Sequence, residues 1–407
     1  MQQAKSLVII GGGAAGFFAA IQAATLSINL EIIILEQGND VLEKVRISGG
    51  GRCNVTHACY EAKELIKYYP RGSKELLSPF YTFNCTHTIE WFEHRNIELK
   101  TEADGRIFPV SNSSQTIIDC LTSEANKYGI KIIKQSKVLK VEKSELFRIY
   151  YNDKNIEADY VLLASGNNAT MWKIMQQLGH SIIAPVPSLF TFTTQHELIK
   201  NLEGISFPSI ESSLMDSKLK INGAILITHV GLSGPAILKL SAFAARELYA
   251  KNYKFTLYIN WINYSQEQAL HLLKEEKNTQ AKKQMSNFSP FDLPHRFWLK
   301  VLEINGIKTN KIVADLSKND IQNIAQTLTK TAFEVISKNT NKDEFVTAGG
   351  IDLREVDFKT MQSKIIPNLF FAGETLNIDA VTGGFNFQAA WTTGFIAGNN
   401  IAQKNCI

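Results

Sequence analysis

Two kinds of hydrophobic pattern alternate along the first third of the chain. Leu7–Ile10 and Ile32–Leu35 are unbroken β-branched or leucine runs, which are typical of strands buried on both faces of a parallel sheet. Between them lies a stretch of small and apolar residues that favours a helix. Residues 114–129 instead place apolar residues at helical spacing and end at Gly129. This order of elements predicts an α/β fold with a doubly wound sheet.

The pattern changes near residue 189. Strand-like alternation comes first, amphipathic lysine-rich helices are predicted at about 264–330, and glycine-rich apolar segments return from residue 345. The opening and closing segments share their character, and the middle differs from both. We therefore predict a nucleotide-binding domain made of residues 1–188 and 345–407, interrupted by an insertion, residues 189–344, that is rich in strands at first and helical at about 264–330.

The composition is that of a globular protein of two or three domains. The chain has 407 residues, of which 44% are hydrophobic and 20% charged, and a net charge of +4 that we expect to be spread along its length. The lysines near residues 273–283 are balanced by Glu275 and Glu276, so no nucleic-acid partner is expected. No segment has the length of a membrane span and no leader is predicted, so we expect a cytoplasmic protein without a membrane partner.

The cysteines do not point to a metal or disulfide framework. They form no CxxC pair and show no zinc-like spacing. Reduced thiols in a reducing compartment are therefore expected, and no metal site is predicted. The cysteines are Cys53, Cys59, Cys85, Cys120 and Cys406.

The glycine turn after the first strand carries the strongest chemical signal. Gly11 lets the chain turn sharply, Gly13 leaves room for a pyrophosphate, and Gly16 lets the following helix pack closely on the sheet. Glu36 lies twenty residues after Gly16, where a carboxylate accepts hydrogen bonds from ribose hydroxyls. A dinucleotide site is predicted, and the alternative is a glycine-rich turn of an ordinary α/β domain. The residues expected here are Gly11, Gly13, Ala14, Ala15, Gly16, Glu36 and Gln37.

A second strand, glycine turn and helix occur near the end of the chain. The apolar run at 368–374 ends in Gly373-Glu374, and Thr382–Asn386 leads into a helix of small residues. The helix N-terminus offers backbone N–H groups to a ring carbonyl that becomes anionic on reduction. This segment is predicted to bind the other half of the dinucleotide. Taken by itself, the segment is better explained as one more βα unit of the sheet, and it is the first glycine turn that favours the cofactor interpretation.

The third glycine-rich segment is Ser48–Thr56, with the sequence SGGGRCNVT. Its three glycines give a closely approachable backbone, and Asn54 offers hydrogen bonds. Arg52 is a candidate to bridge a phosphate or a ring carbonyl. The alternative is a structural turn with a salt-bridged arginine.

Taken together, these segments resemble the HI0933-like (YhiN/BaiN) family of NAD(P)/FAD-dependent oxidoreductase flavoproteins. The resemblance runs nearly from end to end and is weakest in residues 240–340. Asn377 replaces an aspartate of the family, which puts a proton-transfer role there in doubt. The similar segments are GGGAAG with Glu36, ISGGGRCNVT at 47–56, GRIFPVS at 105–111, THVGLSGPAIL at 228–238, VTAGGIDL at 346–353 and the segment 359–398.

The resemblance implies FAD as the cofactor. It also implies a glutathione-reductase-type, Rossmann-like FAD domain that is interrupted by an inserted β-barrel-like domain with a small helical part. It further implies a set of cofactor-binding residues beyond the first glycine turn. These are Lys44, Ser48, Gly49, Gly50, Arg52, Cys53, Asn54, Val138, Ser165, Gly166, Gly373, Glu374, Asp379, Gly383, Gly384, Phe385 and Asn386.

No side chain stands out as a catalyst. His229 and Cys53 are weak candidates, and a structural histidine and a small buried thiol are the alternatives. The prediction is an FAD-dependent oxidoreductase that transfers a hydride between the flavin and a small organic substrate. NAD(P)H is a candidate transient electron donor. The alternatives are a tRNA-modifying flavoprotein and a flavin-binding redox-sensing or structural protein, and the substrate and oligomeric state stay open.

Overall fold

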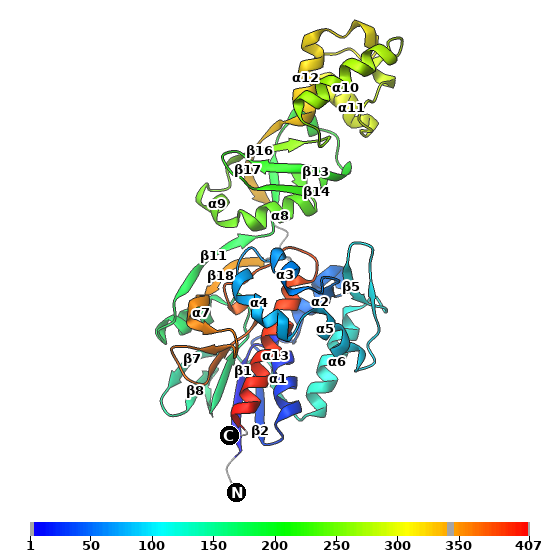
Figure 1. Cartoon of the computed structure of the whole chain (residues 1–407). Helices are drawn as coiled ribbons and strands as arrows, with labels where there is room; N and C mark the ends of the chain where they lie inside the picture. The colour runs from blue at the N-terminus through cyan, green and yellow to red at the C-terminus, as the bar shows by residue number, and fades with distance from the viewer. Residues whose placement is uncertain (1–3, 340–345, 406–407) are drawn as a thin grey trace. The chain divides into compact units, whose positions relative to one another are not determined.

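The computed structural model describes residues 4–339 and 346–405, so Cys406 lies outside the described residues. The chain divides into two units (Figure 1). The first comprises Met1–Val186 with Val346–Ile407, and the second is the inserted stretch Pro187–Phe345.

A mixed sheet of seven strands forms the centre of the first unit. Its order is β19-β20-β21-β10-β1-β2-β6, and β21, β10, β1, β2 and β6 are parallel. The central strands are buried on both faces, which explains their unbroken apolar sequences. The strands are β1 (Lys5–Ile10), β2 (Leu30–Leu35), β6 (Lys131–Ile133), β10 (Tyr160–Leu163), β19 (Val356–Asp357), β20 (Gln362–Ser363) and β21 (Leu369–Phe371).

Two helices of small residues pack on each other beside this sheet. They are α1 (Ala14–Leu26) and α13 (Phe385–Asn405), from opposite ends of the chain. A Cβ on Gly398 would lie 2.5 Å from the carbonyl oxygen of Ala19, so only glycine permits this approach. The predicted amphipathic helix is α6 (Ser114–Lys127), whose first turn is capped by the Ser113 side chain.

Shorter elements surround this sheet in the first unit. One small sheet has the order β3-β5-β4, another has the order β7-β8-β9, and β11 pairs with β18. These elements are α2 (Glu43–Gly51), β3 (Thr56–His57), α3 (Ala62–Leu65), η1 (Ile66–Tyr68), α4 (Ser73–Thr82), α5 (Cys85–Glu93), β4 (Leu99–Thr101), β5 (Arg106–Pro109), β7 (Val138–Lys143), β8 (Phe147–Tyr151), β9 (Lys154–Ala158), α7 (Ala169–Gln177), β11 (Ile182–Ser188), β18 (Val346–Ile351), η5 (Leu353–Glu355) and η6 (Gly373–Thr375).

The inserted unit contains a closed antiparallel barrel with the order β12-β15-β14-β13-β16-β17. Its strands alternate buried and exposed residues, as one-sided burial requires. The Rossmann-type domain and the inserted barrel predicted from the sequence are thus confirmed. The strands are β12 (Thr191–Thr194), β13 (Ser206–Leu214), β14 (Lys220–Thr228), β15 (Gly231–Ser233), β16 (Phe255–Asn260) and β17 (Thr331–Asn339).

A helical part of the inserted unit lies between β16 and β17 in the sequence (Figure 1). Trp261 links it to the barrel, because its ring packs on Phe297 of α11 and its Nε1 donates to the Thr331 hydroxyl at 2.9 Å. The helices of this unit are η2 (Glu197–Ile199), α8 (Pro235–Phe243), α9 (Ala245–Ala250), α10 (Gln266–Thr279), η3 (Met285–Asn287), α11 (His295–Ile304), η4 (Val313–Asp315) and α12 (Lys318–Thr329).

Candidate functional site

The predicted site residues of the first unit gather at the carboxyl ends of β1, β10 and β21. β1 has β2 on one side and β10 on the other, so the strand order reverses there. Ligands of open α/β sheets bind at such a point. The turn after β1 touches the turn after β10, since a Cβ on Gly11 would lie 2.5 Å from the carbonyl oxygen of Ala164. Gly11 has φ +116°, which a side chain disfavours.

The glycines of the first turn have different surroundings. Gly16 of α1 packs against the Gly11 carbonyl, so it serves close packing within the turn. Gly13 is the N-cap of α1, and a Cβ there would have no protein atom within 4 Å. Ala14 and Ala15 follow as the first residues of α1. The open space beside Gly13 and the free N–H groups of the first helical turn fit a pyrophosphate.

Glu36 lies directly beneath this turn. Its Oε2 accepts from Gly12 N at 2.8 Å and its Oε1 accepts from Gly38 N at 2.7 Å. Each carboxylate oxygen keeps a second lone pair, so the group is able to accept ribose hydroxyls as well. Two other predicted residues lie near Glu36. The Gln37 side chain accepts a hydrogen bond from Asn168, and Ser136 N, in the segment that leads to Val138, donates to the Glu36 carbonyl oxygen at 2.7 Å.

The third glycine segment is part helix and part turn. It begins in α2 and leaves helical geometry at Ser48, and Gly49 and Gly50 have φ +58° and +68°. A Cβ on Gly50 would meet no protein atom within 4 Å, so the backbone is open to a ligand. The Asn54 side chain crosses to the closing segment, where its amide oxygen accepts from Gly384 N at 2.9 Å.

Arg52 and Cys53 occupy structural positions. The Arg52 guanidinium pairs with Glu102 at 2.6 Å and lies 4.0 Å from the Phe108 ring centroid. This is the salt-bridged alternative considered for Arg52 from the sequence. Burial raises the pKa of the Cys53 thiol to about 12, so the thiol stays protonated and a nucleophilic role is disfavoured.

Four predicted site residues lie close together at the carboxyl ends of β10 and β21: Lys44, Ser165, Gly166 and Glu374. The Lys44 ammonium forms an ion pair with Glu374. The Ser165 and Thr375 hydroxyls are 3.3 Å apart, and Thr375 donates to the Gly166 carbonyl at 3.2 Å. Thr375 is therefore a residue of this edge that the sequence motifs did not single out.

The glycine turn at 382–386 leads into α13 and packs against the third glycine segment. Gly383 and Gly384 have φ +127° and +90°, and a Cβ on Gly384 would lie 2.6 Å from the carbonyl oxygen of Thr56. Below this contact, the buried amide oxygen of Gln388 accepts from the hydroxyls of Thr56 at 2.6 Å and Thr88 at 2.9 Å. The N-terminus of α13 is thereby fixed beside the third glycine segment.

A buried ion pair supports the loop before α13. Arg71 binds Asp379 through two nitrogens, and the Asp379 side chain is fully buried. Asn386 holds the same loop by accepting from Ala380 N at 2.9 Å. No motif pointed to Arg71, because its partner lies more than three hundred residues further along the chain.

The sequence matches the family described as "HI0933-like protein Rossmann domain" over residues 5–400. The chain belongs to this family. The resemblance stated from the motifs is confirmed, and so, at the level of the family, is the prediction of an FAD-dependent oxidoreductase. The glycine turns, the open space beside Gly13 and Gly50, and the two helix N-termini fit FAD.

Full-length relatives of this HI0933-like protein have two different names. It is 27% identical to "Ribosomal RNA dihydrouridine synthase" of Escherichia coli (strain K12), covering 98% of each chain. It is 26% identical to the protein of the same name from Haemophilus influenzae, covering 99% of this chain and all of that one. It is also 26% identical to "3-dehydro-bile acid delta(4,6)-reductase" of Clostridium scindens, covering 97% of this chain and 98% of that one.

Solved structures share the fold of this HI0933-like protein. A 3-ketosteroid-delta4-(5alpha)-dehydrogenase from Rhodococcus jostii RHA1 aligns over 99% of this chain and 98% of its own, with a TM-score of 0.52 and 14% identity. A 3-ketosteroid delta1-dehydrogenase from Sterolibacterium denitrificans has the same TM-score at 11% identity, covering 98% of this chain and all of its own. At such identities the likeness concerns the fold alone.

An aromatic cluster of the HI0933-like protein lies at the start of α13. The rings of Phe385 and Tyr68 are stacked with centroids 4.1 Å apart, and His57 packs edge-on to Phe385 at 4.6 Å. Burial lowers the pKa of His57, so its imidazole is neutral at neutral pH, and its buried Nδ1 has no partner among the described atoms. Burial raises the pKa of the Tyr68 phenol, which therefore stays protonated.

His229, the other catalytic candidate, belongs to the inserted unit. It is exposed on the turn between β14 and β15. No pairing or burial distinguishes it from a surface histidine of the described chain. Its catalytic role stays a prediction.

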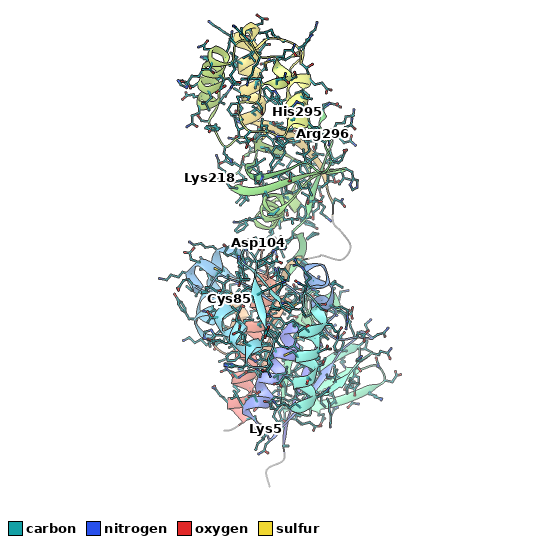
Figure 2. The ribbon with its side chains drawn as sticks, turned by 90° about the vertical axis from the view of Figure 1, so that its right-hand side faces the viewer. Lys5, Cys85, Asp104, Lys218, His295 and Arg296 are labelled. Atoms are coloured by element: carbon teal, nitrogen blue, oxygen red, sulfur yellow. The ribbon has the colours of Figure 1, made fainter. Side chains whose placement is uncertain are left out.

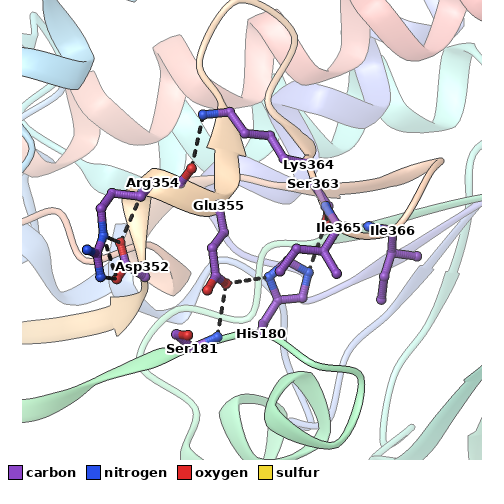
Figure 3. A network of polar contacts seen from close by, with 9 residues as sticks. All are labelled: His180, Ser181, Asp352, Arg354, Glu355, Ser363, Lys364, Ile365 and Ile366. Atoms are coloured by element: carbon purple, nitrogen blue, oxygen red, sulfur yellow. Dashed lines mark hydrogen bonds and ion pairs between the residues drawn. The ribbon is translucent and has the colours of Figure 1, made fainter.

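Glu355, His180 and Ser363 form a carboxylate–imidazole–hydroxyl chain like that of a hydrolytic triad (Figure 3). His180 Nδ1 lies 3.0 Å from Glu355, and its Nε2 lies 3.0 Å from the Ser363 hydroxyl. Ser363 is only 3% exposed, and its oxygen also accepts from the backbone N–H groups of Ile365 and Ile366. The network therefore fixes the β19–β20 hairpin and offers no accessible nucleophile.

The described residues contain neither a candidate metal site nor a candidate membrane span. No group of three or more His, Cys, Asp or Glu side chains is placed to hold a metal ion within residues 4–339 and 346–405. Among the helices formed by these residues, none combines the length and the apolar character needed to cross a membrane.

Proposed function

We propose that this protein is an FAD-dependent reductase of a carbon–carbon double bond conjugated to a carbonyl group. The observation that carries the proposal is the side-by-side packing of α1 and α13, in which the start of α1 at Ala15 lies against Gly394 of α13, in a chain that belongs to the HI0933-like family. The small organic substrate expected from the sequence is one carrier of such a bond, and a uracil base is another.

The names of the relatives support this reaction class. Dihydrouridine is uridine whose C5=C6 bond, conjugated to the C4 carbonyl, has been reduced. A delta(4,6)-reductase of a 3-dehydro-bile acid acts on double bonds conjugated to the 3-ketone. Both names therefore describe the addition of a hydride and a proton across an electron-poor double bond.

In this proposal the chain binds and orients, and bound FAD supplies the hydride. The turn at Gly13 would hold the pyrophosphate, and Glu36 would hold the ribose. The N–H groups at the start of α13 would donate to a flavin ring carbonyl, where their partial positive charge would favour the reduced state. The protonated phenol of Tyr68 is the candidate proton donor at this edge.

NAD(P)H is the proposed electron donor. No second GxGxxG motif follows a strand after the one at Gly11–Gly16, so we propose transient binding of the nicotinamide. Purified protein is mixed anaerobically with NADPH or NADH, and the flavin absorption is followed. A conjugated enone is then added, and the Gly13→Val variant serves as the control without FAD.

The expected result is loss of the flavin absorption with the donor and its return with the enone. A saturated ketone of the same size is expected to leave the flavin reduced. If the flavin is reduced and reoxidised only by oxygen, the reductase proposal fails and the redox-sensing alternative is favoured. If the flavin accepts no electrons from either nicotinamide, the proposed donor is wrong.

A further inference from the structure

The net charge of the protein lies in the inserted unit. Residues 187–345 contain 19 Lys or Arg and 15 Asp or Glu, whereas the rest of the chain contains 24 of each. The expectation that the charge of +4 is spread along the chain is therefore wrong. Long-range attraction of a polyanion would act on the inserted unit.

The glutamates that balance the lysines in the sequence form no ion pair with Lys282 or Lys283 in the described residues. Glu275 pairs with His271 at 3.4 Å, and Glu276 accepts a hydrogen bond from Gln280, so both bind partners near their own positions in the chain. Lys282 and Lys283 follow α10, are exposed, and have no ion pair among the described residues. The charge balance counted along the sequence is therefore not made by ion pairs at Lys282 and Lys283.

These lysines belong to a short two-stranded element, which we call the lysine ladder and define as residues 281–286 and 308–314. Lys283 O accepts from Val313 N and Met285 N donates to Lys311 O, both at 2.9 Å. The side chains of Met285 and Val313 are fully buried beneath it. The lysines are therefore carried by a fixed backbone rather than by a flexible loop.

The ladder contains four lysines and no acid. Lys282, Lys283 and Lys308 are exposed, and Lys311 pairs with Asp320 at 2.6 Å. The ladder's other exposed side chains include polar ones, such as Gln284 and Asn310. On the same helical part Figure 2 labels His295 and Arg296, and Arg296 donates to the carbonyl of Asn201 in the barrel region.

We propose that the lysine ladder is a docking surface for the phosphate backbone of RNA. Exposed ammonium groups without acidic partners bind phosphates, and release of the counterions favours association. Amide groups such as those of Gln284 and Asn310 suit sugar hydroxyls and phosphates better than a lipid surface, which would call for exposed aromatic or aliphatic side chains. The inference rests on the proposed function, because the uracil bases of RNA carry the conjugated double bond named there.

The test compares two surface variants with the wild type. One is Lys282→Gln/Lys283→Gln/Lys308→Gln, and the control is Lys251→Gln/Lys254→Gln, which removes charge from the α9 end of the same unit. The probe is a fluorescein-labelled hairpin of about 40 nucleotides copied from a ribosomal RNA. Its affinity is measured by anisotropy over a range of salt concentrations, and the reduction of FAD by NADPH is measured on the same samples.

The ladder variant is expected to bind the hairpin at least about tenfold more weakly at low salt, with the slope of log affinity against log salt reduced by about two to three. The control is expected to bind like the wild type, and all three proteins to be reduced by NADPH alike. The inference would be overturned if the ladder variant bound the hairpin as tightly as the wild type. It would also be overturned if both variants lost the same amount of affinity, or if the wild type did not bind the hairpin. Enone turnover in the same samples would show that the proposed reaction survives such a failure.

Discussion

The two units of the chain use their charged and polar side chains in different ways. In the first unit, ion pairs join segments far apart in the sequence, as Lys44 joins Glu374 and Arg71 joins the buried Asp379. In the inserted unit, several pairs span a single helical turn, such as Lys251 with Glu247 and Lys300 with Glu303. Side chains of the first kind fix a site, whereas those of the second kind leave a charged surface for a partner.

The largest effect is expected at the first glycine turn, where valine at Gly11 should destabilise the fold and valine at Gly13 should weaken FAD binding. Gly11→Val places a side chain against the Ala164 carbonyl at φ +116°, and we expect a loss of more than about 4 kcal/mol in the free energy of unfolding. Gly13→Val enters open space, so the fold is retained and FAD affinity falls at least about a hundredfold. Denaturant unfolding and flavin content of both variants provide the measurement.

The opposite pattern would contradict the roles given to these glycines. A folded Gly11→Val protein would show that the turns after β1 and β10 do not need their close contact. A Gly13→Val protein with normal flavin content would show that the phosphates bind elsewhere.

Removal of Arg71 tests whether the long-range pairs of the first unit carry stability. Arg71→Leu leaves the Asp379 carboxylate buried without its guanidinium, and the expected cost is about 3–5 kcal/mol in the free energy of unfolding. The double variant Arg71→Leu/Asp379→Leu should recover part of this loss. If the single variant is as stable as the wild type, the pair contributes nothing to the site.

A pH titration of stability compares one buried histidine in each unit. Burial lowers the pKa of both His180 and His196 below the ordinary value of 6.5. The unfolded chain therefore binds protons first, and stability falls as the pH drops below about 6.5, by at most about 1.4 kcal/mol per pH unit and histidine. His180→Gln and His196→Gln should each reduce this slope.

The smallest effect is expected in the inserted unit. Lys251→Ala removes an exposed i,i+4 pair with Glu247, and the free energy of unfolding should change by less than about 0.5 kcal/mol. A loss above about 2 kcal/mol would show that surface pairs of this unit are structural, which would weaken the contrast between the two units. Thermal unfolding of this variant beside Arg71→Leu gives the comparison directly.

The sequence was most informative where local chemistry decides the structure. The glycines at 11, 13 and 16 and the continuous apolar strands act within a few residues, so the sheet and its first turn could be predicted. The barrel was expected from the resemblance to the family, because the alternation along strands such as β16 and β17 indicates burial on one face without distinguishing a barrel from an open sheet.

The rest of the candidate site depends on contacts between residues far apart in the sequence, which no local pattern predicts. Arg71 finds Asp379 and Thr56 finds Gln388 only after the sheet brings the ends of the chain together. The pairing of Arg52 with Glu102 was one of two interpretations that the sequence allowed. The lysine ladder was missed because Glu275 and Glu276 are neighbours of Lys282 and Lys283 in the sequence, although they bind His271 and Gln280 in the structure.

The central claim is that the glycine turns at the two ends of the chain form one FAD site. The most direct test is the visible absorption spectrum of the purified protein, followed by identification of the heat-released ligand against FAD and FMN standards. The account predicts a flavin spectrum and the release of FAD in a stoichiometric amount. A colourless protein that also fails to take up added FAD would contradict it.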